Sequence, residues 1–161
     1  MTDHVWHAVR PPHDLGVIVH GPVILASAPD IAAGLRAVFA YPSGLHLLLT
    51  YRAVGERAVD AGSWSYGRVR RYPGPTADNP YTSPELHVTV NDSAGPAHTS
   101  GHIFNSDDAF SVNASYWISE LPLDDRVLIT LEWPYAGLPL TETVLTLQGL
   151  DNLDDRVLRL L

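Results

Sequence analysis

The sequence predicts a mostly β fold: an antiparallel two-sheet β-sandwich, Ig-like or jelly-roll-like, with about eight strands. Apolar and polar residues alternate in several short runs, as they do in strands that bury one face. Residues typical of turns, chiefly Gly, Pro, Asn and Asp, separate these runs at intervals of about 8–12 residues. Helical periodicity is found only near the C-terminus, so the pattern does not favour a helical bundle.

Length and composition predict one folded domain over residues 1–161. Hydrophobic residues make up 45% of the chain and charged residues 17%. This size is enough for a single core, and the apolar fraction is too high for a disordered chain. Residues 1–13 contain three of the eight His residues and a Pro-Pro pair, and we expect them to form an extended arm.

The first strands are expected before residue 41. The segment Leu15–Pro29 is rich in Val and Ile, and Gly21-Pro22 interrupts it, which indicates one kinked strand or two short ones. Alternation over residues 31–40 predicts another strand; a short helix is the alternative, because Ala and Gly are poor strand formers. The residues expected to share one face of this strand are Ile31, Ala33, Leu35, Ala37 and Phe39.

A hairpin and a long loop are predicted next. The letters YPSG at 41–44 are typical of a turn, and the strand after it would place Leu45, Leu47, Leu49 and Tyr51 on one face. Residues 55–84 contain four Pro and four Gly and lose the alternation, which predicts a long irregular loop. A short strand near Trp64–Val69 is expected within this loop.

Period-two alternation returns in the second half of the chain and predicts the remaining strands. Residues 92–97, with the letters DSAGPA, are expected to turn the chain between two of them. The predicted strands cover residues 85–92, 98–105, 109–121, 126–134 and 141–148. The side chains expected to face the core are Leu86, Val88, Val90, Phe110, Val112, Ala114, Tyr116, Val127, Ile129, Leu131 and Trp133.

The hexamer LDDRVL occurs twice, at 123–128 and at 153–158. The first copy leads into a predicted strand that Pro134 ends. Around the second copy, apolar residues recur at helical spacing, and Asp precedes Arg in the order that suits the helix dipole. We therefore predict a short C-terminal helix over 150–161 and no internal structural repeat.

Charge and composition argue against several classes of protein. The formal net charge is −8, and all ten basic residues are Arg, so the basic surface of a nucleic-acid-binding protein is not expected. No segment is apolar and long enough to span a membrane, and the N-terminus lacks the apolar region of a secretory signal, so we expect a cytoplasmic location. Cys is absent, which excludes thiolate chemistry, and no cofactor is expected.

Two groups of residues are candidate binding sites. His98 and His102 lie four apart, and His87 falls on a predicted neighbouring strand, so these three could bind a metal ion; exposed strand His residues are the alternative. A binding platform for a ligand or partner is the second hypothesis, formed by Trp64, Tyr66, Tyr72 and Tyr81 of the long loop. No known nucleophile or phosphate-binding motif occurs, and no catalytic residue is assigned.

Two segments, 23–53 and 116–143, carry a resemblance to a known group of proteins. The positions that carry it are Tyr41, Pro42, Gly44, Trp117, Leu121, Pro122, Glu132, Trp133 and Pro134. In these features the chain resembles a group of small uncharacterised actinobacterial all-β proteins. The resemblance implies one domain and a bacterial source, and it implies no activity.

The sequence favours a non-enzymatic role. We expect a binding or interaction protein of a bacterial cytoplasmic system that uses sheet or loop surfaces. Its partner would be another protein or a second copy of the chain in a homo-oligomer, with neither nucleic acid nor membrane involved. The alternative is a small β-fold enzyme with a ligand cavity, made metal-dependent by His87, His98 and His102.

Overall fold

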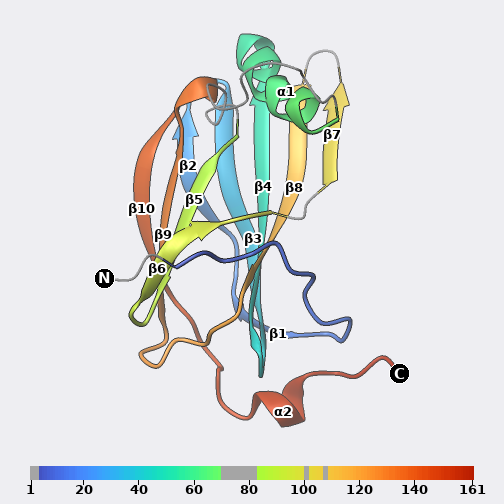
Figure 1. Cartoon of the computed structure of the whole chain (residues 1–161), viewed down its shortest axis with the longest axis vertical. Coiled ribbons are helices and arrows are strands. Elements are labelled where there is room, and N and C mark those ends of the chain that lie inside the picture. Colours follow the sequence, from blue (N-terminus) through green and yellow to red (C-terminus); the bar gives the residue numbers. More distant parts are fainter. Residues whose placement is uncertain (1–3, 70–82, 100–101, 107–108) are drawn as a thin grey trace.

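The computed structural model describes residues 4–69, 83–99, 102–106 and 109–161, with the side chains of all of these except 63, 65–69 and 102–106. These residues form ten strands in two antiparallel sheets, which confirms the predicted sandwich (Figure 1). The elements in chain order are β1 (Val17–His20), β2 (Val23–Ala28), β3 (Ile31–Tyr41), β4 (Gly44–Val54), α1 (Gly55–Val69), β5 (Glu85–Val90), β6 (Ser93–Ala97), β7 (His102–Ser106), β8 (Ala109–Ile118), β9 (Arg126–Trp133), η3 (Pro134–Ala136), β10 (Leu138–Thr146) and α2 (Leu153–Arg156).

The larger sheet has the order β1-β3-β4-β8-β7, and β2 also pairs with β3. Since β4 occupies one edge of β3, β1 and β2 follow one another along its other edge. Gly21-Pro22 separates these two short strands, as predicted. The smaller sheet has the order β10-β9-β5-β6. A hydrogen bond from the Gln148 N–H to the Val19 carbonyl, 2.9 Å long, joins the chain after β10 to β1.

The core lies between the two sheets, and the alternation of the sequence places it correctly. All the side chains predicted to face the core on β4, β5, β8 and β9 are buried. Aromatic rings from both sheets meet there: the Trp133 ring lies 5.6 Å from Tyr51 and 5.8 Å from Phe110. The hydroxyl groups of Tyr51 and Tyr116 lie 2.7 Å apart, so each buried hydroxyl has a partner.

The predicted loop over 55–84 is wrong in its first half, because residues 55–69 form α1. This helix covers one end of the sandwich (Figure 1) and inserts Trp64 between the sheets, 5.5 Å from Trp133 and 5.9 Å from Tyr51. Packing of Ala58, Ala61 and Trp64 stabilises a helix whose Gly and Ser residues have low helix propensity. The strand predicted near Trp64 is therefore wrong as well. Residues 70–82 lie outside the described part of the chain.

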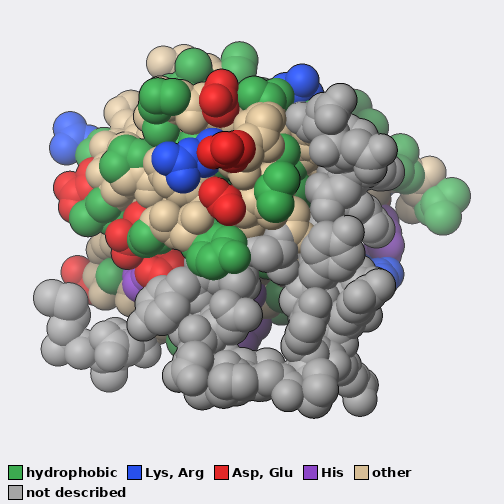
Figure 2. All heavy atoms as spheres, turned by 90° about the horizontal axis from the view of Figure 1, so that it is seen from above, with side chains coloured by type: hydrophobic (Ala, Val, Ile, Leu, Met, Phe, Trp, Pro, Cys, Tyr) green, Lys and Arg blue, Asp and Glu red, His purple; other side chains and the backbone are tan. Residues whose placement is uncertain are grey.

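Figure 2 views the end of the molecule that carries α1. In its described part, acidic, basic and apolar side chains are interspersed, so this part shows no patch of one charge sign. Arg57 and Asp60 form one exposed ion pair within α1, 3.8 Å between Nη1 and Oδ2. Such an exposed pair contributes little to stability.

Residues 31–40 form a strand rather than a helix, but the predicted face changes partway along it. Arg36 is an extra residue in β3, because Leu35 pairs with Leu49 while Ala37 pairs with Leu48. This β-bulge shifts the alternation by one residue. After the bulge the buried side chains are Val38 and Ala40, and the predicted Ala37 and Phe39 are only half-buried.

The described part of the N-terminal arm packs against the domain. Trp6 is 2% exposed, and its indole N–H donates a hydrogen bond of 3.0 Å to the Val88 carbonyl. Backbone hydrogen bonds join the arm to β6, including that from the Trp6 N–H to the Pro96 carbonyl at 2.9 Å. The predicted turn at 92–97 is thus wrong after Asp92, because residues 93–97 form a strand between the arm and β5.

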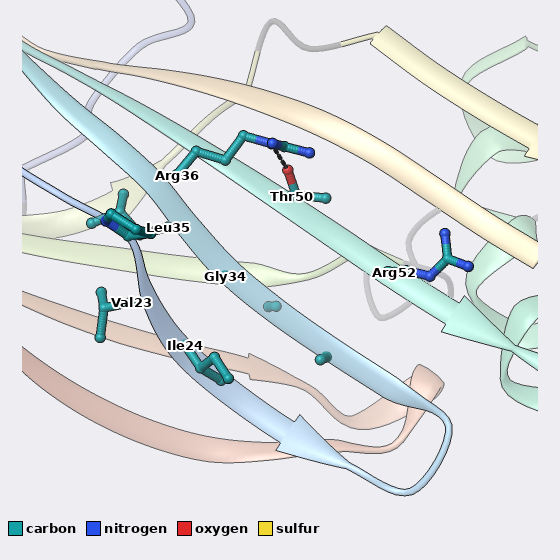
Figure 3. Close-up of a pocket in the computed structure, with 10 residues that line it drawn as sticks. Val23, Ile24, Gly34, Leu35, Arg36, Thr50 and Arg52 are labelled. Atoms are coloured by element: carbon teal, nitrogen blue, oxygen red, sulfur yellow. Dashed lines mark hydrogen bonds between the residues drawn. The ribbon is translucent and has the colours of Figure 1, made fainter.

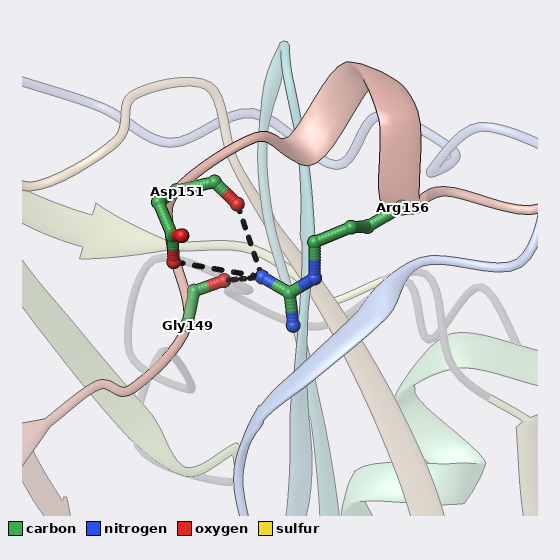
Figure 4. A network of polar contacts seen from close by, with 3 residues as sticks. All are labelled: Gly149, Asp151 and Arg156. Carbon is green, nitrogen blue, oxygen red and sulfur yellow. Dashed lines mark hydrogen bonds and ion pairs between the residues drawn. The ribbon is translucent and has the colours of Figure 1, made fainter.

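The C-terminal helix is shorter than predicted. It consists of the single turn α2, after which Leu158 pairs with Leu15 in an antiparallel bridge. Arg156 holds the preceding loop: its Nη1 donates to the Gly149 carbonyl and, at 3.0 Å, to the Asp151 carbonyl (Figure 4). These contacts fix the end of the chain against the sandwich.

Candidate binding groove

The three predicted metal-binding His residues do not lie on neighbouring strands. His87 is exposed on β5 of the smaller sheet, whereas His102 lies on β7 at the edge of the larger one. His98 is exposed just after β6, and the His102 side chain is outside the described set. Among the described side chains, no three His, Asp or Glu residues lie close enough to hold a metal ion.

The structure removes Trp64 from the predicted aromatic binding platform. Trp64 is 5% exposed and packs in the core, so it offers no ring to a ligand or partner. Tyr66 is on α1, but its side chain is outside the described set, as are Tyr72 and Tyr81.

Described residues cover the outer face of the larger sheet at one end. There Tyr41 and Trp117 are buried, with ring centroids 5.9 Å apart. The segment before β1 packs over them, because the Tyr41 hydroxyl donates to the Asp14 carbonyl at 2.9 Å and Gly16 lies directly against the Tyr41 ring. Among the described residues the opposite end of this face, toward α1, is open: Arg52 is exposed there, and Ala32 and Gly34 are half-buried.

The open end contains a groove of about 440 Å³ (Figure 3). Its floor is β3, where Ala32 and Gly34 face outward with small side chains or none. One wall comes from Pro22, Val23 and Ile24, and Ile24 is 70% exposed. This wall is apolar. The groove is hollow beside it because Ala32 and Gly34 on β3 have small side chains or none.

The opposite wall is polar. It consists of Arg36, Thr50 and Arg52, which the pairing of β3 with β4 brings together. Arg36 Nε donates a hydrogen bond to Thr50 Oγ1, and the Thr50 hydroxyl donates at 2.8 Å to Asn113 Oδ1. The bulge at Arg36 aims this guanidinium across β4 (Figure 3), so the wall is held by a chain of hydrogen bonds.

Neither Arg36 nor Arg52 forms an ion pair with any side chain that the structure describes. Both side chains are exposed. These two Arg residues thus place positive charge beside the apolar groove, on a chain with a formal net charge of −8.

Comparisons with protein-family models, with curated proteins and with solved structures find no match for this chain. Its function therefore has to be argued from the site itself. None of the described helices is long and apolar enough to cross a membrane.

A His–Ser pair lies on the same sheet face but outside the groove. His46 Nε2 and Ser115 Oγ are 2.5 Å apart, and burial lowers the pKa of His46 below its ordinary value of 6.5. A neutral imidazole beside a hydroxyl is part of a nucleophilic site, which also needs a group to orient the base. No carboxylate of the described residues bonds to His46, and the Phe39 ring lies 5.7 Å from it. Among the described residues, the pair thus has no third group that would orient the base.

Two carboxyl groups face each other on the outer face of the smaller sheet. Glu85 on β5 is directly opposite Glu132 on β9. Partial burial, followed by the hydrogen bond with Glu132 and its charge, raises the pKa of Glu85, and nearby His87 opposes this effect. This face is thus acidic, in contrast to the groove on the other sheet.

Proposed function

We propose that the protein is a non-enzymatic binding protein that holds a partner in the groove of the larger sheet. One observation supports this most: an exposed apolar wall faces two Arg residues that have no ion-pair partner among the described side chains. A partner with an apolar group and a carboxylate would cover both. Arg residues and apolar side chains are typical of the centre of protein interfaces.

The shape of the groove favours a partner over a substrate. It is open along the sheet face, whereas small-molecule sites bury most of the ligand surface. Its polar side chains are those of Arg36, Thr50 and Arg52, which do not form a nucleophile–base pair. The proposal includes a bacterial cytoplasmic setting, which rests on the absence of Cys and on the resemblance described above.

Titration with 8-anilinonaphthalene-1-sulfonate, an apolar anion, tests the groove as a binding site. Followed by ¹H–¹⁵N NMR, saturable shifts are expected at Ala32, Gly34 and Thr50. Ile24→Ser and Arg52→Gln should each weaken binding about tenfold, because each removes one of the two recognised features.

Two exposed residues outside the groove serve as matched controls: Leu140→Ser and Arg126→Gln should bind the probe like the wild type. Far-UV circular dichroism would check that every variant is folded. Shifts spread evenly over both sheets, or equal binding by groove and control variants, would contradict the proposed function.

A further inference from the structure

We propose that the occupant of the groove is the Leu123–Asp125 turn of a second copy of this chain, so that copies associate head to tail. The inference rests on the proposed function of the groove. It is carried by the complementarity between two surfaces of the same molecule, an apolar groove with two Arg residues and an apolar turn with two Asp residues. None of these four residues forms an ion pair among the described side chains.

The turn exposes a large apolar side chain on a rigid support. Leu123 is 92% exposed, and its N–H donates a 2.8 Å hydrogen bond to Asn91 Oδ1. Asn91 Nδ2 in turn donates to the Leu121 carbonyl at 3.0 Å and to Glu120 Oε2 at 2.7 Å. The turn is therefore preorganised, which lowers the entropic cost of binding.

Two carboxylates accompany Leu123. Asp124 and Asp125 are exposed, and neither forms an ion pair with the side chains that the structure describes. One oxygen of Asp124 accepts the Arg126 N–H at 3.1 Å, which leaves the other free. Opposite charges on two docking surfaces steer association and fix its register.

The second hexamer does not offer the same surface. Leu153 is 5% exposed, so its copy of LDDR presents Asp154 and Asp155 without an apolar group. The sequence LDD therefore forms the proposed docking element at 123–125, and its second copy at 153–155 serves as a matched control.

The turn and the groove lie at different ends of the molecule. The turn precedes β9 at the lower end in Figure 1, and the groove lies on the half of the sheet nearer α1. Because the contact joins two different surfaces, it is heterologous, and a pair of copies keeps one free turn on one copy and one free groove on the other. Since the docking element is a turn of only three residues, we expect it to bury less than the roughly 800 Å² per partner of a stable interface and to bind with a dissociation constant of about 10–100 µM.

Sedimentation velocity of the full chain over a concentration series tests the inference. Arg36→Gln with Arg52→Glu is the groove variant, and Asp124→Arg with Asp125→Asn is the turn variant. Asn is chosen at position 125 because the backbone φ there is +62°, which Asn tolerates. Leu123→Ser removes only the exposed apolar group.

The wild type should associate as its concentration rises, and less so at high salt. The groove variant, the turn variant and Leu123→Ser should each weaken association at least about tenfold. A mixture of the groove and turn variants should associate again, because the turn variant keeps an unaltered groove and the groove variant keeps an unaltered turn. Asp154→Arg with Asp155→Asn should behave like the wild type.

A wild type that stays monomeric, or groove and turn variants that associate normally, would overturn the inference. So would a mixture of the two variants that stays monomeric. If the probe anion still binds in the groove while the chain is monomeric, the groove is a binding site for another molecule, and only the second-copy occupant is wrong. Circular dichroism of each variant separates loss of docking from loss of fold.

Discussion

Leu123 and Leu153 occupy the same position in the repeated hexamer, yet one is 92% exposed and the other 5%. The difference comes from their neighbours in space. The first copy is tied to Asn91 on the β5–β6 turn, which holds Leu123 away from the core. The second follows Asn152, whose φ of +54° starts a single helical turn that buries Leu153. The six residues of the hexamer therefore do not determine its conformation, because the two copies form different hydrogen bonds with the residues around them.

The two Arg residues of the hexamer give a direct test. Arg156→Ala should lower the free energy of unfolding by about 1 kcal/mol, since it removes the bonds to the Gly149 and Asp151 carbonyls. Arg126→Ala should change it by less than about 0.5 kcal/mol, because Arg126 is exposed and its side chain makes no hydrogen bond to a described residue. Urea denaturation measures both, and equal effects would mean that Arg156 does not hold the loop.

At the scale of elements, the alternation of apolar and polar residues predicts where the strands lie but not where a β-bulge interrupts them. The core faces of β4, β5, β8 and β9 follow period two without interruption, so the sequence predicts them. The bulge at Arg36 leaves no simple signal, because hydrogen bonding to β4 decides it. The groove depends on this bulge and on strand register, and neither can be predicted from the sequence of a single strand. The sequence features that could have indicated the groove are the small residues Ala32 and Gly34 at outward-facing positions, followed by Arg36.

The N-terminal arm depends on one glycine of β6. A Cβ at Gly95 would lie 1.5 Å from the His4 carbonyl oxygen, so Gly95→Ala should displace the arm and expose Trp6. We expect a loss of about 3 kcal/mol in unfolding free energy and a red shift of tryptophan fluorescence. The control is Gly21→Ala, because no atom lies within 4 Å of that Cβ. Similar behaviour of the two variants would show that the arm does not pack on β6 in solution.

The cross-strand carboxyl pair between β5 and β9 predicts a pH dependence. The pKa of Glu85 is higher in the folded protein than in the unfolded chain, so the folded state binds more protons in that range. Stability is therefore lost as pH rises from about 4.5, the ordinary value, through the raised one. Glu132→Gln should raise the Tm above this range and leave it unchanged below it.

Glu142→Gln is the control for this pair, since Glu142 faces Thr130 rather than a carboxyl group. Thermal unfolding between acidic and neutral pH compares the two variants. If Glu142→Gln raised the Tm as much, the effect would reflect the overall negative charge instead of the facing carboxyl groups.

At the scale of the whole molecule, both sheets and α1 share one core. Trp64 from α1 contacts Tyr51 and Phe110 of the larger sheet and Trp133 of the smaller one, with ring centroids 5.5–6.3 Å apart. The sequence predicted the sandwich because both sheets need an apolar face. It did not reveal the helix, because Gly and Ser interrupt the segment and tertiary packing supplies its stability.

Trp64→Ala should therefore destabilise the whole domain and not α1 alone. Loss of the ring opens a cavity among three aromatic side chains, with an expected cost of about 3–5 kcal/mol. Val59→Ala, at a 72% exposed position of the same helix, should change stability by less than about 0.5 kcal/mol. Because the core is shared, unfolding followed by tryptophan fluorescence and by far-UV circular dichroism should coincide in both variants. A Trp64→Ala protein whose helix melts first, with the sandwich as stable as before, would show that α1 is an independent unit.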